Sequence, residues 1–245
     1  MFIILSPAKR MAAVSRIPPQ SRPQFMAQAA CLADILKGYA PGPLAAALKT
    51  SPALALRAYM DYQDMDLTAS GAAALFAYQG LVFSTMQTDG FSAGEVDFAQ
   101  NHLRILSGLY GLLRPLDGIL PHRLEMGCRL PAAGGSLYGY WADRLYQALF
   151  AAGDTVVNLA SAEYARAVTP YLAPKDRMIT CEFFTLSRGR YRVMATAAKM
   201  ARGAMARYAI TAGIDRPEGL QGFDSLGYRF SPERSTDRIY RFYQQ

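Results

Sequence analysis

Short runs of apolar and β-branched residues alternate with longer helical patterns along this 245-residue chain, and this alternation constrains its fold most. Such runs predict strands because β-branched and aromatic side chains pack well on a pleated sheet. The predicted strands span residues 2–5, 81–83, 155–159, 178–186 and 191–195. Strands interspersed with helices predict a mixed α/β (α+β) fold around a mixed sheet.

Capping signals locate several helices. Ser51 and Pro52 pair an N-cap with a first-turn proline, and Ser92 with Glu95 forms a capping-box pattern that begins a helix toward Asn101. The other strong helical patterns cover 136–150 and 196–211. Between the last two predicted strands, the Ser-Arg-Gly-Arg stretch at 187–190 predicts a hairpin turn, because glycine supplies the positive φ of tight turns.

The composition is that of one globular unit. About half of the residues are apolar and 18% are charged, and no Pro- or Ser-rich linker divides the chain, so residues 1–245 are expected to form a single domain. No stretch approaches the roughly 18 apolar residues needed to span a bilayer, and no membrane association is expected. Cys31, Cys128 and Cys181 lie outside disulfide and zinc patterns. A cytoplasmic location is therefore expected.

Positive charge is concentrated in two parts of the chain. The formal net charge is +7, no acid precedes Asp34, and six cations with no acid lie between residues 183 and 214. These cations are Arg188, Arg190, Arg192, Lys199, Arg202 and Arg207. If they meet the early cations Lys9 and Arg10 in space, they form an anion-binding surface.

Two segments at strand ends carry polar groups. Ser6 and Lys9 follow the first predicted strand, and Asn158 and Ser161 lie where another strand leads into a helix. Ligands of α/β proteins bind at such strand ends, although Lys9 could equally be a solvated lysine and Ser161 an ordinary N-cap. A third segment holds Arg123 and Glu125, which could form either a site pair or a structural ion pair.

The most informative stretch covers residues 101–130, which is basic and punctuated by glycine. A helix leading into the Ser-Gly-Leu-Tyr-Gly run at 107–111 and out into a short helix resembles a helix-hairpin-helix, whose glycines let backbone N–H groups approach a phosphate. Two residues separate Gly108 from Gly111, whereas the usual hairpin has one. A tight turn between buried elements is the alternative.

Other catalytic signatures are absent from the sequence. It contains no G-x-S-x-G, P-loop, G-x-G-x-x-G or H-E-x-x-H motif. With only His102 and His122 and no ligand cluster, no metal site and no cofactor are expected, and direct iron ligation is the weakest functional hypothesis.

Together these segments resemble the YaaA peroxide-stress family. The resemblance rests on residues 6–9, 97–126, 138–143, 156–164, 198–205 and 222–228, and most specifically on 107–117 followed by 123–127. It implies a single-domain α/β fold, DNA binding through a positively charged cleft and a helix-hairpin-helix-like element, and protection against peroxide with lowered free iron. Arg10, where the family commonly has threonine, and Gln79, where it has a basic residue, depart from the pattern.

Two functions compete. The first is binding of duplex or distorted DNA, with low sequence specificity and through its phosphates, in the response to peroxide. The residues expected to contact DNA are Lys9, Arg10, Arg104, Ser107, Gly108, Leu109, Tyr110, Gly111, Arg114, Lys199 and Arg202. The second is an enzyme acting on a small anionic substrate in a pocket of Ser6, Lys9, Arg114, Arg123, Glu125, Asn158 and Ser161. Protein partners are not indicated by the sequence.

Overall fold

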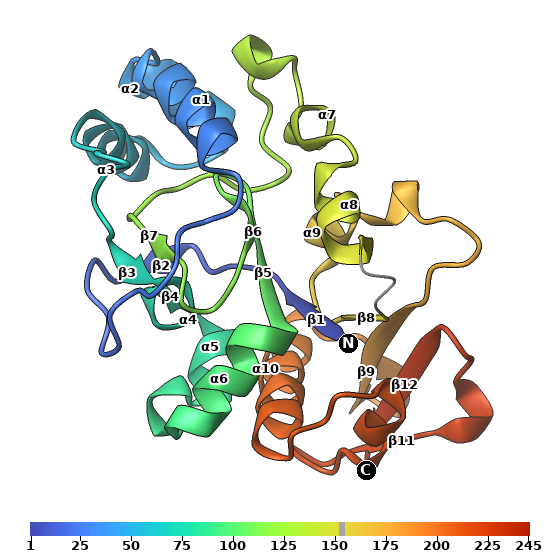
Figure 1. Ribbon diagram of the computed structural model, residues 1–245. Coiled ribbons are helices and arrows are strands. Elements are labelled where there is room, and N and C mark those ends of the chain that lie inside the picture. Colours follow the sequence, from blue (N-terminus) through green and yellow to red (C-terminus); the bar gives the residue numbers. More distant parts are fainter. Residues whose placement is uncertain (152–154) are drawn as a thin grey trace.

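A computed structural model of the chain describes residues 1–151 and 155–245 (Figure 1). The strands are β1 (Phe2–Leu5), β2 (Arg10–Met11), β3 (Ala72–Ala73), β4 (Tyr78–Gln79), β5 (Leu103–Ser107), β6 (Gly111–Leu113), β7 (Gly118–Ile119), β8 (Val156–Asn158), β9 (Met178–Ser187), β10 (Arg190–Arg192), β11 (Tyr228–Phe230) and β12 (Ile239–Gln244).

Helices occupy most of the remaining chain. The α-helices are α1 (Met26–Lys37), α2 (Pro41–Leu48), α3 (Pro52–Gln63), α4 (Ala74–Ala77), α5 (Leu81–Met86), α6 (Ala93–His102), α7 (Leu137–Trp141), α8 (Arg144–Phe150), α9 (Ala162–Ala165) and α10 (Ala195–Thr211). The 3₁₀-helices are η1 (Thr88–Gly90), η2 (Pro131–Ala133), η3 (Thr169–Tyr171), η4 (Pro217–Gly222) and η5 (Pro232–Arg234).

The main sheet is mixed, as the sequence predicts. In the described residues its order is β11-β12-β9-β8-β1-β5-β6, with β10 paired to β9 beside this path. The five strands from β12 to β5 are parallel, while β6 and β11 close the two edges in antiparallel pairs. Two small sheets, β2 with β4 and β3 with β7, lie outside it.

The central strand β1 is a topological switch point. Its neighbour on one side is β5, and its neighbour on the other side is β8, so the chain crosses to opposite sides of β1. The loops that leave such strands diverge and open a crevice at their carboxyl ends. The segments after β1 and β8 therefore meet at one edge of the sheet, which is where the polar side chains of Ser6 and Ser161 were expected.

One hydrophobic core holds the elements together. It extends from the β1 strand through α1 and α6 to β12 at the other end of the chain, and it includes fully buried Trp141, Tyr62 and Phe183. α10 packs mainly on α5 and also touches α6 and β9, and Figure 1 shows these three helices side by side. The fold is thus a single mixed α/β domain.

The predicted helix starts are confirmed. The Ser51 side chain accepts a hydrogen bond from Leu54 N, with Pro52 in the first turn, and Ser92 with Glu95 completes a capping box at α6. The turn between β9 and β10 is also confirmed: Arg188 and Gly189 have φ of 50° and 72°. These values suit a two-residue hairpin turn, which matches the right-handed twist of its strands.

Three predictions of elements are wrong. Residues 81–83 form the start of α5 rather than a strand, and residues 193–195 lead into α10 instead of extending β10. The pattern at 136–150 is interrupted at Ala142, whose φ is 46°, and this break separates α7 from α8. Short apolar runs do not distinguish buried helix from buried strand, which accounts for the first error.

The helix-hairpin-helix is replaced by a β-hairpin. Residues 103–107 form β5 rather than a helix, and residues 111–113 pair with them as β6. The apolar run before Ser107 is therefore a strand of the central sheet, parallel to β1, and the glycines serve its turn. No helix flanks this turn on either side.

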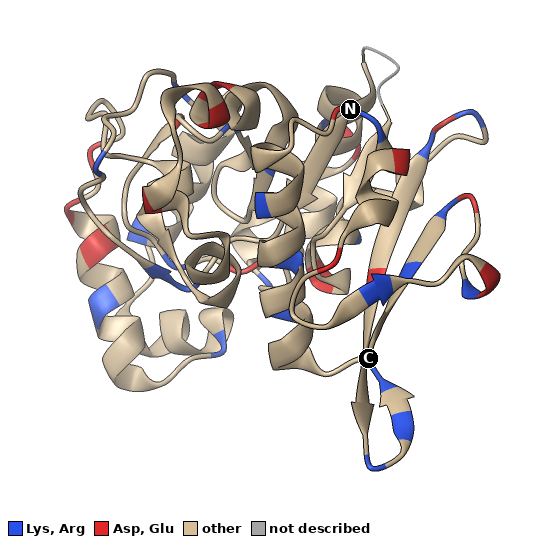
Figure 2. Ribbon diagram, turned by 90° about the horizontal axis from the view of Figure 1, so that it is seen from below, with Lys and Arg blue, Asp and Glu red and all other residues tan. Residues whose placement is uncertain are grey.

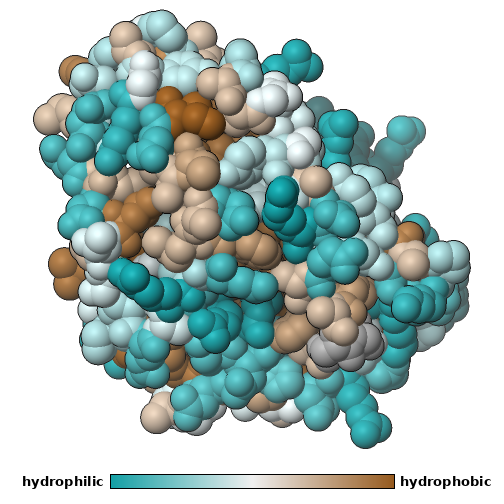
Figure 3. Space-filling model, turned by 45° about the horizontal axis from the view of Figure 1, so that its top comes forward, coloured by the Kyte–Doolittle hydropathy of each residue, from teal (hydrophilic) through white to brown (hydrophobic). Residues whose placement is uncertain are grey.

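The surface mixes hydrophilic and apolar residues. Figure 3 shows apolar patches separated by hydrophilic side chains on the face turned forward there. Within the described residues, no helix has both the length and the apolar character needed to cross a membrane.

Candidate functional site

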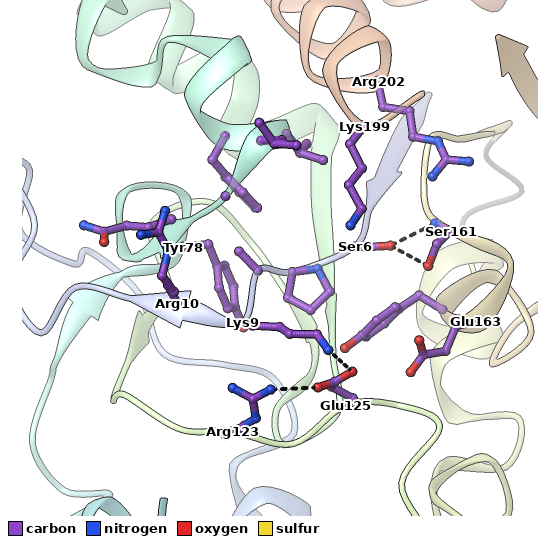
Figure 4. Close-up of a pocket in the computed structure, with 18 of the residues that line it drawn as sticks. Ser6, Lys9, Arg10, Tyr78, Arg123, Glu125, Ser161, Glu163, Lys199 and Arg202 are labelled. Atoms are coloured by element: carbon purple, nitrogen blue, oxygen red, sulfur yellow. Dashed lines mark hydrogen bonds and ion pairs between the residues drawn. The ribbon is translucent and has the colours of Figure 1, made fainter. Parts of the chain in front are cut away.

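A pocket of about 300 Å³ lies at the carboxyl ends of β1 and β8. It is bounded by the loop after β1, α5, α10, the segment around Glu125 and the start of α9 (Figure 4). Its polar lining is Ser6, Lys9, Arg10, Gln79, Arg123, Glu125, Ser161, Glu163, Lys199 and Arg202. The site thus draws on segments that are up to about 200 residues apart in the chain.

Two serines link the strand ends. Ile4 of β1 stands opposite Asn158 of β8, so both strands leave the sheet at the same level. The Ser161 backbone N–H donates to Ser6 Oγ over 2.8 Å, and Ser6 Oγ lies 3.2 Å from Ser161 Oγ. Because each serine holds the other in place, their hydroxyl groups have a fixed direction at the centre of the pocket.

An ion-pair network forms one wall. Lys9 Nζ lies 2.9 Å from Glu125 Oε2, and Arg123 Nη2 lies 3.5 Å from Glu125 Oε1. The Tyr62 hydroxyl donates to the Arg123 carbonyl over 3.0 Å and anchors this segment to α3. The Lys9 side chain is 63% exposed, so its pair with Glu125 contributes at most about 1 kcal/mol to stability. The network therefore sets the position of these charges more than it stabilises the fold.

Two cations of α10 form the opposite wall. Lys199 and Arg202 are three residues apart and share one face of the helix. Figure 4 shows them on the other side of Ser6 from the Lys9–Glu125 pair. Gly203, the next residue, permits close packing of α10 on α5, since a Cβ there would lie 2.2 Å from the Val82 carbonyl oxygen.

The buried guanidinium group of Arg202 is only partly compensated by hydrogen bonds and counter-charges. Its Nε is buried without a hydrogen-bond partner among the described residues, and within residues 1–151 and 155–245 neither Lys199 nor Arg202 forms an ion pair. Desolvation lowers the pKa of Arg202 from its ordinary value. A desolvated cation without a counter-charge favours an anionic ligand, because the anion replaces the lost hydration.

Aromatic groups form the buried part of the lining. Tyr78, Tyr164 and His122 are 3%, 7% and 9% exposed, and Phe83 is also buried. Burial raises the pKa of Tyr78 and Tyr164 and lowers the pKa of His122 to about 4. These three side chains are consequently neutral at pH 7.

The balance of charge in the pocket is positive. Its lining includes the cations Lys9, Arg10, Arg123, Lys199 and Arg202 and the carboxylates of Glu125 and Glu163. Arg10 stands opposite Gln79 in the small sheet of β2 and β4, so the two departures from the family pattern are neighbours. The site is thus suited to an anion that also presents hydrogen-bond donors to a carboxylate.

Most of the predicted pocket residues are brought together. Ser6, Lys9, Arg123, Glu125 and Ser161 line the same pocket, and Lys9 meets Glu125 as expected. The pairing of Arg123 with Glu125 is likewise observed.

Arg114 and Asn158 were expected in this pocket and do not line it. Asn158 is 5% exposed, and its side chain bonds Ala160 N and Thr180 Oγ1, so it shapes the turn after β8. Arg114 pairs with buried Asp117 and donates to the Arg22 carbonyl.

Arg104, expected to contact DNA, also lies outside the pocket. Its guanidinium lies over the Phe2 ring at 4.3 Å and bonds the carbonyls of Gln100 and Leu103. These contacts give it a structural role in holding α6 against β5 and β1.

The expected hairpin contacts to DNA conflict with burial. Ser107, Leu109 and Tyr110 are at most 1% exposed, and the backbone of Gly108 faces Leu124. The Ser107 hydroxyl accepts from Tyr110 N, and the Gly108 carbonyl accepts from Trp141 Nε1. A Cβ at Gly111 would lie 2.7 Å from the Trp141 ring. The turn therefore packs inside the protein, which is the alternative considered for this motif.

Glu163 is one of the site residues that sequence reasoning missed. Its Oε1 accepts from Gly127 N over 2.8 Å, and its backbone carbonyl accepts from the Tyr138 hydroxyl. It lies two residues after Ser161, at the start of α9, and this proximity to a predicted site residue was the available signal. Tyr78 and Tyr164 were also missed. Tyr164 directly follows Glu163 and carried the same signal, whereas nothing in the sequence around Tyr78 marks it as a pocket residue.

Two buried cysteines adjoin the pocket: Cys128 N donates to the Glu125 carbonyl over 3.0 Å, and Cys181 lies near Arg202. Burial raises the pKa of the Cys128 and Cys181 thiols, to about 11 and about 12, while Cys31 is exposed. In the part of the chain that the structure describes, no group of three or more His, Cys, Asp or Glu side chains could hold a metal ion.

Fold and site together define an α/β protein with a basic pocket at the switch point of a mixed sheet. A family model described as peroxide stress protein YaaA matches residues 1–234. The chain belongs to this family, which is named for a role in oxidative stress. The resemblance seen in the sequence is thereby confirmed.

Relatives cover nearly the whole chain. A UPF0246 protein of Lacticaseibacillus casei is 42% identical over 238 residues, covering 96% of each chain. UPF0246 proteins of Limosilactobacillus fermentum and Verminephrobacter eiseniae are each 43% identical, covering 99% and 96% of this chain and 99% and 95% of their own.

Proposed function

We propose that this protein acts in the peroxide response in the cytoplasm by binding DNA through phosphate groups at the basic pocket. The observation that carries the proposal is the convergence of Lys9, Arg10, Lys199 and Arg202 from opposite ends of the chain. Binding to phosphates supplies affinity without sequence preference, because every sequence presents the same backbone. DNA that is covered in this way is shielded from the radicals that peroxide and free iron generate.

The proposed footprint differs from the sequence-based one. It centres on the pocket cations rather than on the buried turn at 107–111. The hairpin of β9 and β10 adds the exposed cations Arg188, Arg190 and Arg192, and Figure 2 shows this hairpin extending from the body of the protein. Arg114, 45% exposed in its side chain, stays a predicted phosphate contact outside the pocket.

Fluorescence anisotropy with unrelated 20-base-pair duplexes, across a salt series, tests the proposal. Affinity should fall steeply with salt, with a log-log slope of about −0.9 per phosphate neutralised, and should vary little with sequence. Lys199→Gln should reduce the magnitude of the slope by about one. Lys175→Gln removes the same charge from an exposed residue outside the pocket and should reduce the slope less. Salt-insensitive binding, or none at low salt, would refute DNA binding.

A second candidate is an enzyme that acts on a small anionic substrate. It is favoured by the enclosure of the Lys9–Glu125–Arg123 network and the Ser6–Ser161 pair within one pocket of about 300 Å³. A carboxylate is a liability in a groove that binds only phosphate, whereas it can serve as a general acid or base in an enzyme. Failure of DNA binding in the salt series would leave this candidate as the better one.

A further inference from the structure

The pocket has a size and a lining that phosphate binding alone does not explain. Its volume of about 300 Å³ lies at the lower end of the range for small-molecule sites, and its buried part carries Tyr78, Phe83 and Tyr164. A phosphate group needs neither such depth nor aromatic surface. A duplex, whose major groove alone is about 12 Å wide, cannot enter a cavity of this size.

The carboxylates pose a second question. Glu125 and Glu163 lie in a site that is otherwise cationic, and Glu125 is 25% exposed in its side chain. A carboxylate repels phosphate but accepts hydrogen bonds from the exocyclic amino group of a nucleobase, as acidic side chains do with cytosine N4. The cations of α10 and the Glu125 carboxylate lie on opposite sides of Ser6 in Figure 4. One wall therefore suits a phosphate, and the other presents Glu125, whose two oxygens face Lys9 and Arg123 and can each accept one further hydrogen bond from an amine.

We propose that the pocket binds one nucleotide unit whose base carries an exocyclic amino group. The phosphate lies against Lys199 and Arg202, the base packs against the aromatic lining, and the amine donates to Glu125. This inference deepens the proposed function and rests on it for one source of the ligand, a nucleotide extruded from DNA. The other source with the same chemistry is a free mononucleotide.

An extruded nucleotide gives the charges of the site a common explanation. Proteins that read a base out of the helix place it in a closed pocket lined by aromatic and apolar side chains and recognise its Watson–Crick edge by hydrogen bonds. Extrusion is least costly at mismatched or distorted positions, where stacking is already weakened. Preference for distorted DNA would follow from the pocket without any contact to a particular sequence.

Free nucleotides test the pocket directly. Calorimetric titration with dCMP and dUMP compares two bases that differ at position 4, which carries an amine in one and a carbonyl in the other. The wild type should bind dCMP about tenfold more tightly than dUMP, and both more tightly than inorganic phosphate. Glu125→Gln should abolish the preference, because its amide can also donate to the uracil carbonyl. Lys175→Gln should keep it.

DNA labelled with 2-aminopurine distinguishes the two sources. The fluorescence of this base rises when it leaves the stack, so wild-type protein should raise it several-fold at a mismatch in a saturated duplex. Leu81→Trp adds an indole at an exposed residue of the lining, 42% exposed, and should suppress the rise, whereas Lys175→Gln, outside the pocket, should leave it unchanged.

The outcomes separate the inference from the proposed function. Selective dCMP binding with a fluorescence rise supports extrusion from DNA, and selective dCMP binding without a rise identifies free nucleotides as the ligand. Equal binding of dCMP, dUMP and phosphate, with no rise, overturns the inference. In that last case, salt-dependent duplex affinity would leave DNA binding by phosphate contacts intact.

Discussion

At the scale of single residues, His122 of the pocket lining makes the stability of the protein depend on pH. Its ring meets Tyr78 and Tyr110 edge-on, and its Nδ1 lies 2.8 Å from the Leu120 carbonyl oxygen. With this nitrogen as the donor, the neutral ring is already satisfied. Desolvation lowers the pKa of His122 to about 4, against an ordinary value of 6.5. The folded protein therefore binds this proton less readily than the unfolded chain does.

The sign of the resulting pH dependence follows from linkage. Stability is complete above pH 6.5, is lost as the pH falls toward about 4, and levels off below that value as far as this residue is concerned. Within this window, His122 alone should lower the free energy of unfolding by about 1.4 kcal/mol per pH unit. Urea denaturation at pH 7.5, 5.5 and 4.5 measures the loss.

Two variants isolate the contribution of His122. His122→Asn retains a donor for the Leu120 carbonyl but does not titrate, so its stability should fall less between pH 6.5 and 4.5. His102→Asn replaces the other histidine of the chain and is the matched control. Equal acid sensitivity of the wild type and His122→Asn would show that other groups govern the loss.

The candidate site was predictable where polar residues lie at strand ends. Ser6 and Ser161 follow neighbouring parallel strands, and the meeting of Lys9 with Glu125 was expected and is observed at 2.9 Å. Glu163 was not predicted, because its role depends on the Gly127 N–H, which is brought to it by tertiary folding. Arg114 was misplaced because its side chain turns to the buried Asp117.

At the scale of elements, the glycines of the β5–β6 hairpin have a structural role that differs from the predicted one. Gly108 and Gly111 were expected to bring backbone N–H groups close to a phosphate. In the structure they allow the turn to pack closely against Leu124 and Trp141. A Cβ at Gly108 would lie 2.3 Å from the Leu124 carbonyl oxygen. The segment containing Leu124 also carries Arg123 and Glu125, so the turn supports one wall of the pocket from behind.

Gly108→Ala should therefore destabilise the fold. The added methyl group meets backbone rather than a flexible side chain, and we expect a loss of about 2 kcal/mol or more in the free energy of unfolding, measured by urea denaturation. Gly94→Ala in α6 is the control, since a Cβ there has no atom within 4 Å and alanine favours helix. A stable Gly108→Ala protein with weakened DNA affinity would instead support the original hairpin hypothesis.

Helix and strand were confused where an apolar run is short. Residues 103–107 form a strand because they pair with β1. That strand lies about 100 positions earlier in the chain, so no pattern within residues 103–107 indicates the pairing. Signals that act locally were reliable: the caps at Ser51 and Ser92 and the turn at Gly189 are all observed.

At the scale of the whole molecule, peroxide protection should not depend on thiol chemistry. Cys128 and Cys181 are buried, and their raised pKa values keep them protonated, which makes them poor nucleophiles toward peroxide. A variant with Cys31, Cys128 and Cys181 replaced by alanine should protect cells as the wild type does. Survival after hydrogen peroxide, with thermal denaturation as a check on folding, measures this. Loss of protection by a well-folded triple variant would contradict it.

The mixed character of the sheet was predicted from the sequence, but the order of its strands was not. Runs of apolar residues identified β1, β8 and β9, and the mixed character of the sheet is confirmed. The order of the strands depends on contacts between distant segments, such as Ile3 with both Leu103 and Val157. The location of the site could not be predicted for the same reason, because it depends on which strands flank β1.

The central place of β1 also has a consequence for biosynthesis. Its two neighbours in the main sheet, β5 and β8, are synthesised only about 100 and about 155 residues after β1, and the α10 wall comes later still. Until then the apolar β1 segment has no partner in the main sheet, and such exposed strands invite aggregation. The nascent chain can therefore complete the lining of its pocket only after α10 has been synthesised.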